Sequence, residues 1–188
     1  APGGNILAGL TTPTAGTTIG VVTNGGGAIR SVVSGNFNIN QGKVLTAQGG
    51  DILILSTSGN IDAGRGALTS LSTPPPTRKA VTVTPEATPE DPNPEPVVIG
   101  YTYTLPPSIS GSGIQTLTSD PDGLGPRTAP TPGSTALITP AGVVDAGEAG
   151  IRSGGAIFVD AQAVLNSSNI SSGGPSVGVP VATSGSLA

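Results

Sequence analysis

The sequence contains no cysteine, histidine, methionine or tryptophan among its 188 residues, and only two tyrosines and two phenylalanines. Without histidine or cysteine, it has no Ser-His-Asp triad, no cysteine nucleophile, no disulfide and no usual zinc or haem site. So few aromatic side chains also provide no stacking platform for nucleic-acid bases. We therefore expect a protein without a bound cofactor or metal.

Charge and apolar runs exclude two further classes of partner. Seven basic residues against eleven acidic ones give a net charge of -4, which repels nucleic-acid phosphates and anionic membrane surfaces. No run of about 18 apolar residues is present, so we expect no membrane insertion. Residues 1–4 (Ala-Pro-Gly-Gly) open without a signal peptide and suit a processed mature form. The absence of cysteine and the low charge favour a secreted protein at the bacterial cell surface.

The residues that are abundant favour an all-β fold. Glycine occurs 30 times and proline 19 times, and both are unfavourable inside helices. Isoleucine and valine together outnumber leucine, and β-branched side chains pack well on a pleated sheet. Because large side chains are scarce, a wide sandwich core is hard to fill. A narrow aliphatic core, as in a β-solenoid built from short stacked coils, fits this composition better.

Two motifs repeat with nearly the same offset. Gly-Gly-Ala-Ile at residues 26–29 returns as Gly-Gly-Asp-Ile at 49–52, and Gly-Asn-Phe at 35–37 returns as Gly-Asn-Ile at 59–61. Glycine and asparagine tolerate positive φ and turn corners readily. A period of about two dozen residues is the size of one β-helix coil. The sequence therefore predicts that Ile29 and Ile52 lie directly above one another.

The repeat is interrupted by a proline-rich excursion. We expect solenoid coils over residues 1–72, an insertion over 73–134, further coils over 135–172, and a Gly/Pro/Val tail over 173–188. Within the insertion, residues 80–84 and 97–104 alternate strictly and predict strands. A further strand candidate spans 113–118.

An ordered set of motifs resembles a known family. Residues 49–67, the prolines at 74–76 and residues 142–152 resemble the C-terminal region of filamentous-haemagglutinin-like bacterial exoproteins, and the resemblance extends weakly over 25–180. It implies a right-handed parallel β-helix, two-partner secretion through an outer-membrane partner, and adhesive or fibrous roles at the cell surface.

Two sets of charged residues are candidate sites. Asp62 and Asp145 occupy matching Asp-Ala-Gly corners, so they are either a carboxylate pair for glycoside cleavage or turn caps that accept backbone N–H groups. Arg65, Glu148 and Arg152 form with Asp62 either a local ion-pair set or a group of solvated charges. The sequence Asp-Pro-Asp-Gly at 120–123 is either a calcium ligand set or a plain turn.

The strand over 97–104 is the other candidate. It carries Val97, Ile99, Tyr101 and Tyr103 on one face. A strictly alternating strand on proline-rich arms either adds to the sheet edge of a neighbour or folds back on its own solenoid.

Three functions follow from these patterns. The first is a structural subunit that stacks head to tail through exposed solenoid ends into a homopolymeric surface or matrix filament, with strand addition as a further contact. The second is an adhesin module that binds a cell-surface receptor or matrix. The third is a polysaccharide-active β-helix enzyme that uses Asp62 and Asp145. The sequence favours the first, which is not an enzyme.

Overall fold

The computed structural model describes residues 3–11, 20–23, 25–66, 77–89, 92–104, 111–118 and 130–181. These residues form an all-β structure with a single short 3-10 turn in the described part, η1 at Ser167–Asn169. The strands are β1 Ile6–Leu7, β2 Gly20–Thr23, β3 Ile29–Val33, β4 Phe37–Asn38, β5 Lys43–Thr46, β6 Ile52–Ser56, β7 Ile61–Asp62, β8 Thr77–Val83, β9 Val97–Thr104, β10 Gly113–Thr116, β11 Thr135–Asp145, β12 Ile151–Ser153, β13 Ile157–Leu165, β14 Ile170–Ser172 and β15 Ser176–Val177. No described helix is long and apolar enough to cross a membrane.

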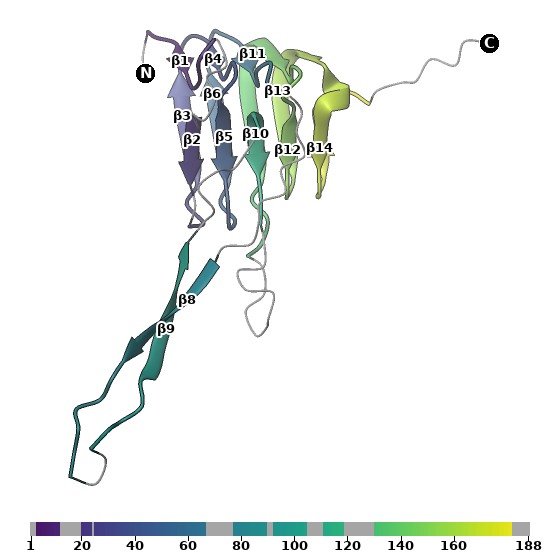
Figure 1. Cartoon of the computed structure of the whole chain (residues 1–188). Helices are drawn as coiled ribbons and strands as arrows, with labels where there is room; N and C mark the ends of the chain where they lie inside the picture. Colours follow the sequence, from purple (N-terminus) through teal and green to yellow (C-terminus); the bar gives the residue numbers. More distant parts are fainter. Residues whose placement is uncertain are drawn as a thin grey trace.

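Thirteen of these strands form two parallel sheets whose strands stack along one axis (Figure 1). The eight-stranded sheet follows the order β1-β4-β7-β11-β13-β15, with β3 and β6 alongside, and the five-stranded sheet follows β14-β12-β10-β5-β2. Neighbours in each sheet come from successive turns of the chain. This stacking of parallel strands is consistent with the β-solenoid that the repeat predicted.

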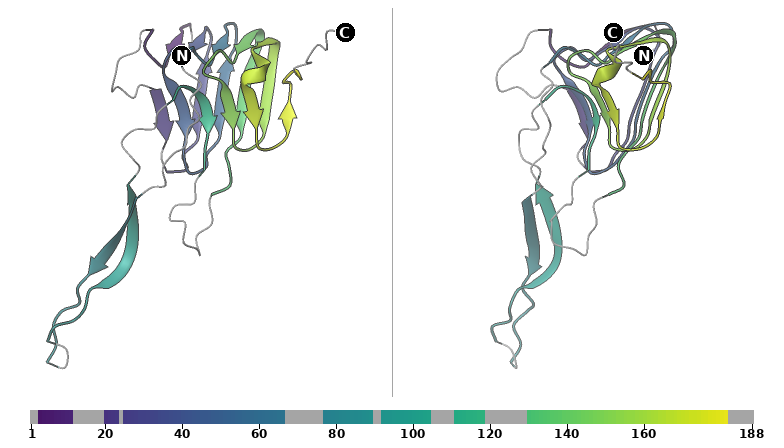
Figure 2. Two further views of the ribbon diagram at one scale, coloured as in Figure 1. Left: turned by 45° about the vertical axis from the view of Figure 1, so that its right-hand side comes forward. Right: turned by 90° about the vertical axis from the view of Figure 1, so that its right-hand side faces the viewer.

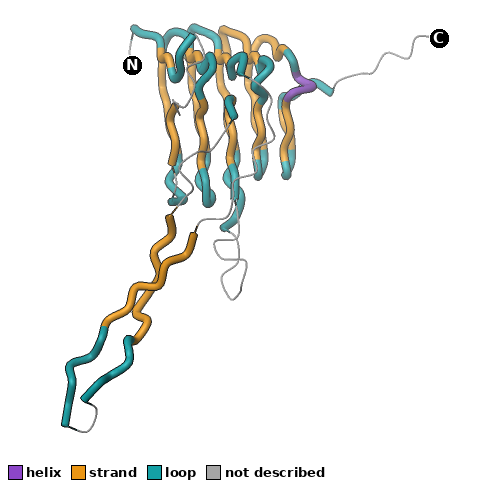
Figure 3. Tube along the Cα trace, in the orientation of Figure 1, coloured by secondary structure: helices purple, strands orange, loops and turns teal. Residues whose placement is uncertain are grey.

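Each coil passes through the five-stranded sheet once and the eight-stranded sheet twice, and the coils superimpose when viewed along the stack (Figure 2). One coil runs through a strand of the five-stranded sheet, then through a long strand of the eight-stranded sheet, and then through a short one. We call the series β3, β6, the first part of β11, the first part of β13 and β15 the long arm. Figure 3 shows strands alternating with loops at the same places in successive coils.

The register of the coils confirms the predicted period. Ile29 pairs with Ile52, and Ile52 pairs with Thr135, which pairs with Ile157. Every second side chain of β6 is buried, so inward aliphatic side chains lie in columns along the axis. Parallel strands lie about 4.8 Å apart, which places stacked side chains in van der Waals contact. The core consists chiefly of Ile29, Val33, Phe37, Ile39, Val44, Ile52, Ile54, Ile61, Ile114, Leu137, Val144, Ile151, Ile157 and Val159.

The corner after each short strand is built by residues with positive φ. Asn40 has φ 52°, Gly64 has φ 96° and Gly147 has φ 56°. A Cβ at Gly64 would lie 2.0 Å from the carbonyl oxygen of Asn40, and one at Gly147 would lie 2.0 Å from that of Gly64. The stacked corners approach too closely for a side chain at these two positions, which explains why glycine recurs there.

The strand candidate over 113–118, placed within the expected insertion over 73–134, forms part of the stack at residues 113–116. This segment is strand β10, which pairs with β5 on one side and β12 on the other. A coil of the stack therefore begins within the expected insertion. The sequence predicted this strand but not its place in the stack, because β10 is only four residues long and is flanked on both sides by stretches rich in glycine, serine and proline.

The last strand also differs from the expected tail over 173–188. β15 at Ser176–Val177 pairs with Ile157 and Phe158 of β13. It therefore extends the long arm into the segment for which the sequence predicted no coil. Its two residues are exposed, which is why apolar periodicity gives no indication of it.

The two strands predicted within the insertion form an antiparallel hairpin. β8 and β9 pair along their length, with an irregularity between Val81 and Thr82. The hairpin extends away from the stack rather than folding back along it (Figure 1). Among the residues of β8 and β9 whose burial is described, all are exposed except Gly100, which is half-buried.

Candidate functional site

The two Asp-Ala-Gly motifs are stacked on neighbouring coils. Asp145 pairs with Asp62, which in turn pairs with Asn38. The carboxylate of Asp62 accepts the backbone N–H of Gly64 at 2.8 Å, and that of Asp145 accepts the N–H of Gly147 at 2.8 Å. Both aspartates are thus turn caps that hold the positive-φ corner in place, which is the second of the two alternatives considered above.

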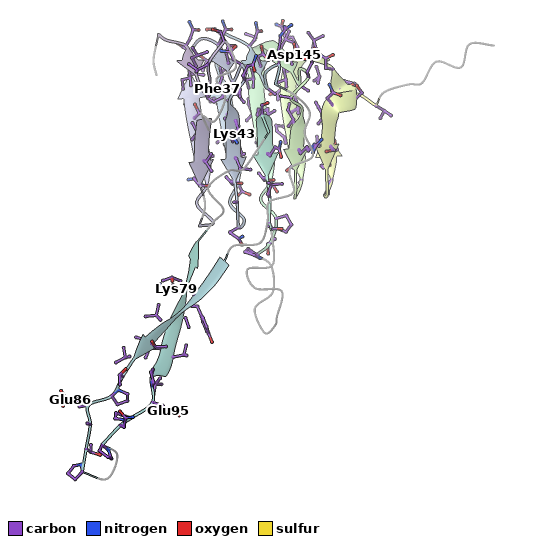
Figure 4. All side chains as sticks on the ribbon, in the orientation of Figure 1. Phe37, Lys43, Lys79, Glu86, Glu95 and Asp145 are labelled. Atoms are coloured by element: carbon purple, nitrogen blue, oxygen red, sulfur yellow. The ribbon has the colours of Figure 1, made fainter. Side chains whose placement is uncertain are left out.

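Asp145 also ties its corner to the following coil. Its Oδ1 atom accepts a hydrogen bond from the side-chain amide of Asn166 at 2.7 Å. The amide of Asn169 in the same turn donates to the carbonyl of Gly147 at 2.6 Å. Figure 4 shows Asp145 at the corner edge of the stack.

A shallow groove of about 290 Å³ runs across this corner. It is lined by Asn36, Asn38, Asn60, Ile61, Asp62, Val143, Asp145 and Leu165. Adjacent strands place the two carboxylates roughly 5 Å apart at the backbone, near the spacing of a retaining glycosidase. The lining, however, holds no aromatic side chain for a sugar ring and no third ionisable group. The two carboxylates therefore stabilise the corner turns through hydrogen bonds to backbone N–H groups.

The four charged corner residues were assigned two alternatives, a local ion-pair set and a group of solvated charges. Arg65 and Glu148 are exposed and Arg152 is half-buried, while the carboxylate of Asp62 binds the backbone N–H of Gly64. These charges therefore fit the solvated alternative. The Asp-Pro-Asp-Gly sequence at 120–123 falls within the segment 119–129, outside the described residues. In the part that the structure describes, no group of three or more acidic, histidine or cysteine side chains is placed to hold a metal ion.

An asparagine ladder beside this groove was not predicted. The side chain of Asn5 accepts the backbone N–H of Asn36 at 2.7 Å, Asn36 accepts that of Asn60 at 2.8 Å, and Asn60 accepts that of Val143 at 2.9 Å. Each amide thereby satisfies a donor on the next coil. The Gly-Asn pair repeated at 35–36 and 59–60 was the available indication, but it was interpreted only as a turn.

The hairpin presents the second set of candidate residues. Val97, Ile99 and Tyr101 are 55%, 64% and 38% exposed. The register shift passes over Ile99, and Val97 and Tyr101 pair with Val83 and Ala80. These two partners lie three residues apart on β8, so Val97 and Tyr101 lie on opposite faces of the hairpin, and the single face expected from strict alternation is wrong. Glu86 and Glu95 lie toward the end of the hairpin that is farther from the stack (Figure 4). The hairpin therefore combines exposed aliphatic side chains and a phenol with an acidic distal end.

The hairpin also has open edges. Among the described residues, β8 pairs with β9 and with no other strand. A strand with one free edge carries unpaired N–H and C=O groups that accept a further strand. The hairpin can therefore take part in strand addition, in which main-chain hydrogen bonds supply affinity and alternating side chains supply specificity.

Comparison with known proteins locates this fold in a family. No curated protein and no solved structure matches the chain. A family model described as "Filamentous haemagglutinin family outer membrane protein" matches residues 49–181, a segment that runs from the second coil through the hairpin to the last strand. The match covers more than half of the sequence and confirms the resemblance that the motifs indicated. The chain therefore belongs to the filamentous haemagglutinin family of outer membrane proteins.

Proposed function

We propose that this chain is a non-enzymatic structural subunit of the bacterial cell surface, which stacks through its end coils on further copies to form a filament. Membership of the family suggests an exoprotein or adhesin role and an association with outer-membrane secretion. The proposal adds head-to-tail assembly. It also assigns the coils a right-handed winding, because crossovers between parallel strands of one sheet are almost always right-handed.

The end strands of the five-stranded sheet carry this proposal. Within the described residues, β2 pairs only with β5, and β14 pairs only with β12, whereas β5, β10 and β12 each have two partners. An outer strand of a stack presents the same backbone groups that bind the next coil inside it. A contact between the two different ends does not close on itself and propagates as a filament.

The charged corner residues have a supporting role in the proposal. Asp62 and Asp145 fix the turns that keep successive coils in register. Arg65, Glu148 and Arg152 keep the corner edge hydrated and separate from neighbouring filaments. Loss of a corner would shift the coils and, with them, the end strands that must match.

The hairpin favours a second function, that of an adhesin module. Strand β9, which carries Val97, Ile99, Tyr101 and Tyr103, would contact a cell-surface receptor or matrix, or add to the sheet edge of a neighbouring copy. The observation that supports this alternative is the extension of the hairpin away from the stack (Figure 1). Apolar side chains held at a distance from the scaffold are suited to contact with a partner.

A pair of matched variants distinguishes the two functions. Val21 in β2 is 43% exposed and Val98 in β9 is 46% exposed, so Val21→Lys and Val98→Lys make the same change at equal exposure. Stacking predicts that Val21→Lys abolishes filaments and leaves only small discrete particles, while Val98→Lys leaves filaments intact. Sedimentation velocity and negative-stain microscopy provide the measurements. If filaments survive Val21→Lys but not Val98→Lys, the assembly contact is made by the hairpin and not by the end strands. If the unmodified chain remains monomeric, the proposal of a filament is refuted.

A further inference from the structure

The outer face of the long arm is apolar where a solvated sheet face is normally polar. The outward residues form two rows across the coils, aligned by the strand register. One row is Arg30, Leu53, Ala136, Phe158 and Val177, and the other is Val32, Leu55, Ile138 and Asp160. A sheet with one face in the core usually alternates apolar inside with polar outside, so this second apolar face requires an explanation.

The face is open in the described structure. Phe158 is 44% exposed, while Leu53 and Ile138 are half-buried. The view along the stack shows no described segment lying across the outside of the long arm (Figure 2). A hollow of about 280 Å³ opens on it, where the small side chain of Ala136 lies between the larger ones of Leu53 and Phe158.

The two charges of this face lie on either side of its central coils. Arg30 belongs to the first coil and Asp160 to the fourth, and both side chains are exposed. Three strand spacings separate their coils, or roughly 14 Å, which is far beyond ion-pair distance. The apolar centre is therefore bounded by a positive charge at one end and a negative charge at the other.

We propose that this face binds a second copy of the chain about a two-fold axis parallel to the strands. Such an axis reverses the order of the coils between the copies. It places Leu53 of each copy opposite the hollow at Ala136 of the other, and Leu55 opposite Ile138. It also places Arg30 over the ring of Phe158 in the other copy, a favourable cation–π geometry, with Asp160 two residues farther along that strand.

Self-complementarity is the reason for choosing a second copy as the occupant. A two-fold interface uses the same patch twice, so the patch must contain its own partners. This face holds a projecting leucine and a hollow at positions that the axis exchanges, and the axis brings the cation of each copy to within two residues of the anion of the other. Two sheets packed face to face with aligned strands are also a standard arrangement, about 10 Å apart. An unrelated protein or a polysaccharide would not require this internal match.

Charge exchange tests the arrangement. In the Val21→Lys background, which blocks end stacking, the dimer dissociation constant is measured by sedimentation equilibrium for Arg30→Asp and Asp160→Arg separately. Each substitution places like charges together at both ends of the interface and is expected to weaken the dimer at least roughly ten-fold. Mixing the two variants restores affinity, because each copy then offers the charge that the other lacks. Arg65→Asp, at an exposed corner position, is the control and leaves the dimer unchanged.

Each other outcome overturns the proposal. A parent chain that remains a single species at high micromolar concentration shows that the face has no second copy as its partner. A dimer that is insensitive to both substitutions lies on another surface. A dimer that is weakened by both but not restored by mixing has a different geometry from the one proposed. If the Val21→Lys chain does not fold, as judged by circular dichroism, the same series is measured in the unmodified chain and the dimer is scored by disulfide crosslinking of Leu55→Cys with Ile138→Cys.

Discussion

Replacement of Gly59 by alanine provides a direct test of coil-on-coil packing. A Cβ at this position would lie 2.3 Å from the carbonyl carbon of Gly35 and 2.5 Å from the nitrogen of Asn36, where real Cβ contacts essentially never fall below 3.0 Å. Both atoms are backbone atoms of the previous coil, so no side chain can rotate away. A Cβ built on Gly142 in the next coil would likewise lie 2.0 Å from the carbonyl oxygen of Gly59.

The size of the effect follows from this geometry. The corner must open by about 0.7 Å, in a stack where strands lie about 4.8 Å apart, and forcing extra atoms into a packed interior costs about 1–3 kcal/mol. For a chain of this size, that loss lowers Tm by roughly 2–12 °C. Because the neighbouring coils share the corner, the cost extends to both interfaces of the coil.

Thermal and urea unfolding of Gly59→Ala, followed by circular dichroism, measures this loss. Gly25→Ala is the control, since nothing lies within 4 Å of a Cβ built there. We expect that control to keep its stability or to gain up to about 1 kcal/mol from a less flexible unfolded chain. Equal effects of the two substitutions would refute the stacked-corner argument.

Two further predictions concern the groove and the buried lysine. Asn60→Ala removes the acceptor of the Val143 N–H and is expected to lower the free energy of unfolding by about 0.5–1.5 kcal/mol. Asn38→Ala, in the same groove, is the control, and faster amide exchange at Val143 is the specific readout. Burial lowers the pKa of the Lys43 ammonium below its ordinary 10.5, so the unfolded chain binds more protons between the two values. The free energy of unfolding therefore rises with pH across that window, and Lys43→Met abolishes this rise in pH-dependent urea titrations.

The sequence by itself determined the repeating unit. The spacing of Gly-Asn and Gly-Gly pairs predicted that Ile29 lies above Ile52, and the structure places them in register. Scarcity of large side chains, together with abundant isoleucine and valine, predicted a slender aliphatic core. The strict alternation over 97–104 likewise predicted β9. These features are local, because periodicity and turn chemistry depend on residues within one or two coils.

Only the tertiary structure determines which strands pair with one another across the inserted segments. The sequence does not reveal that Ser134 binds Asp51, 83 residues earlier, at 2.8 Å, nor that β10 belongs between β5 and β12. The position of a four-residue strand in a sheet depends on backbone hydrogen bonds to its two neighbours, because so short a segment has too little sequence pattern to define that position. The outward-facing apolar row could not be predicted from the sequence for a related reason. A run such as Ile-Leu-Ile-Leu at 52–55 has the same pattern whether its second face is buried or exposed, and only the packed coils show which face meets the core.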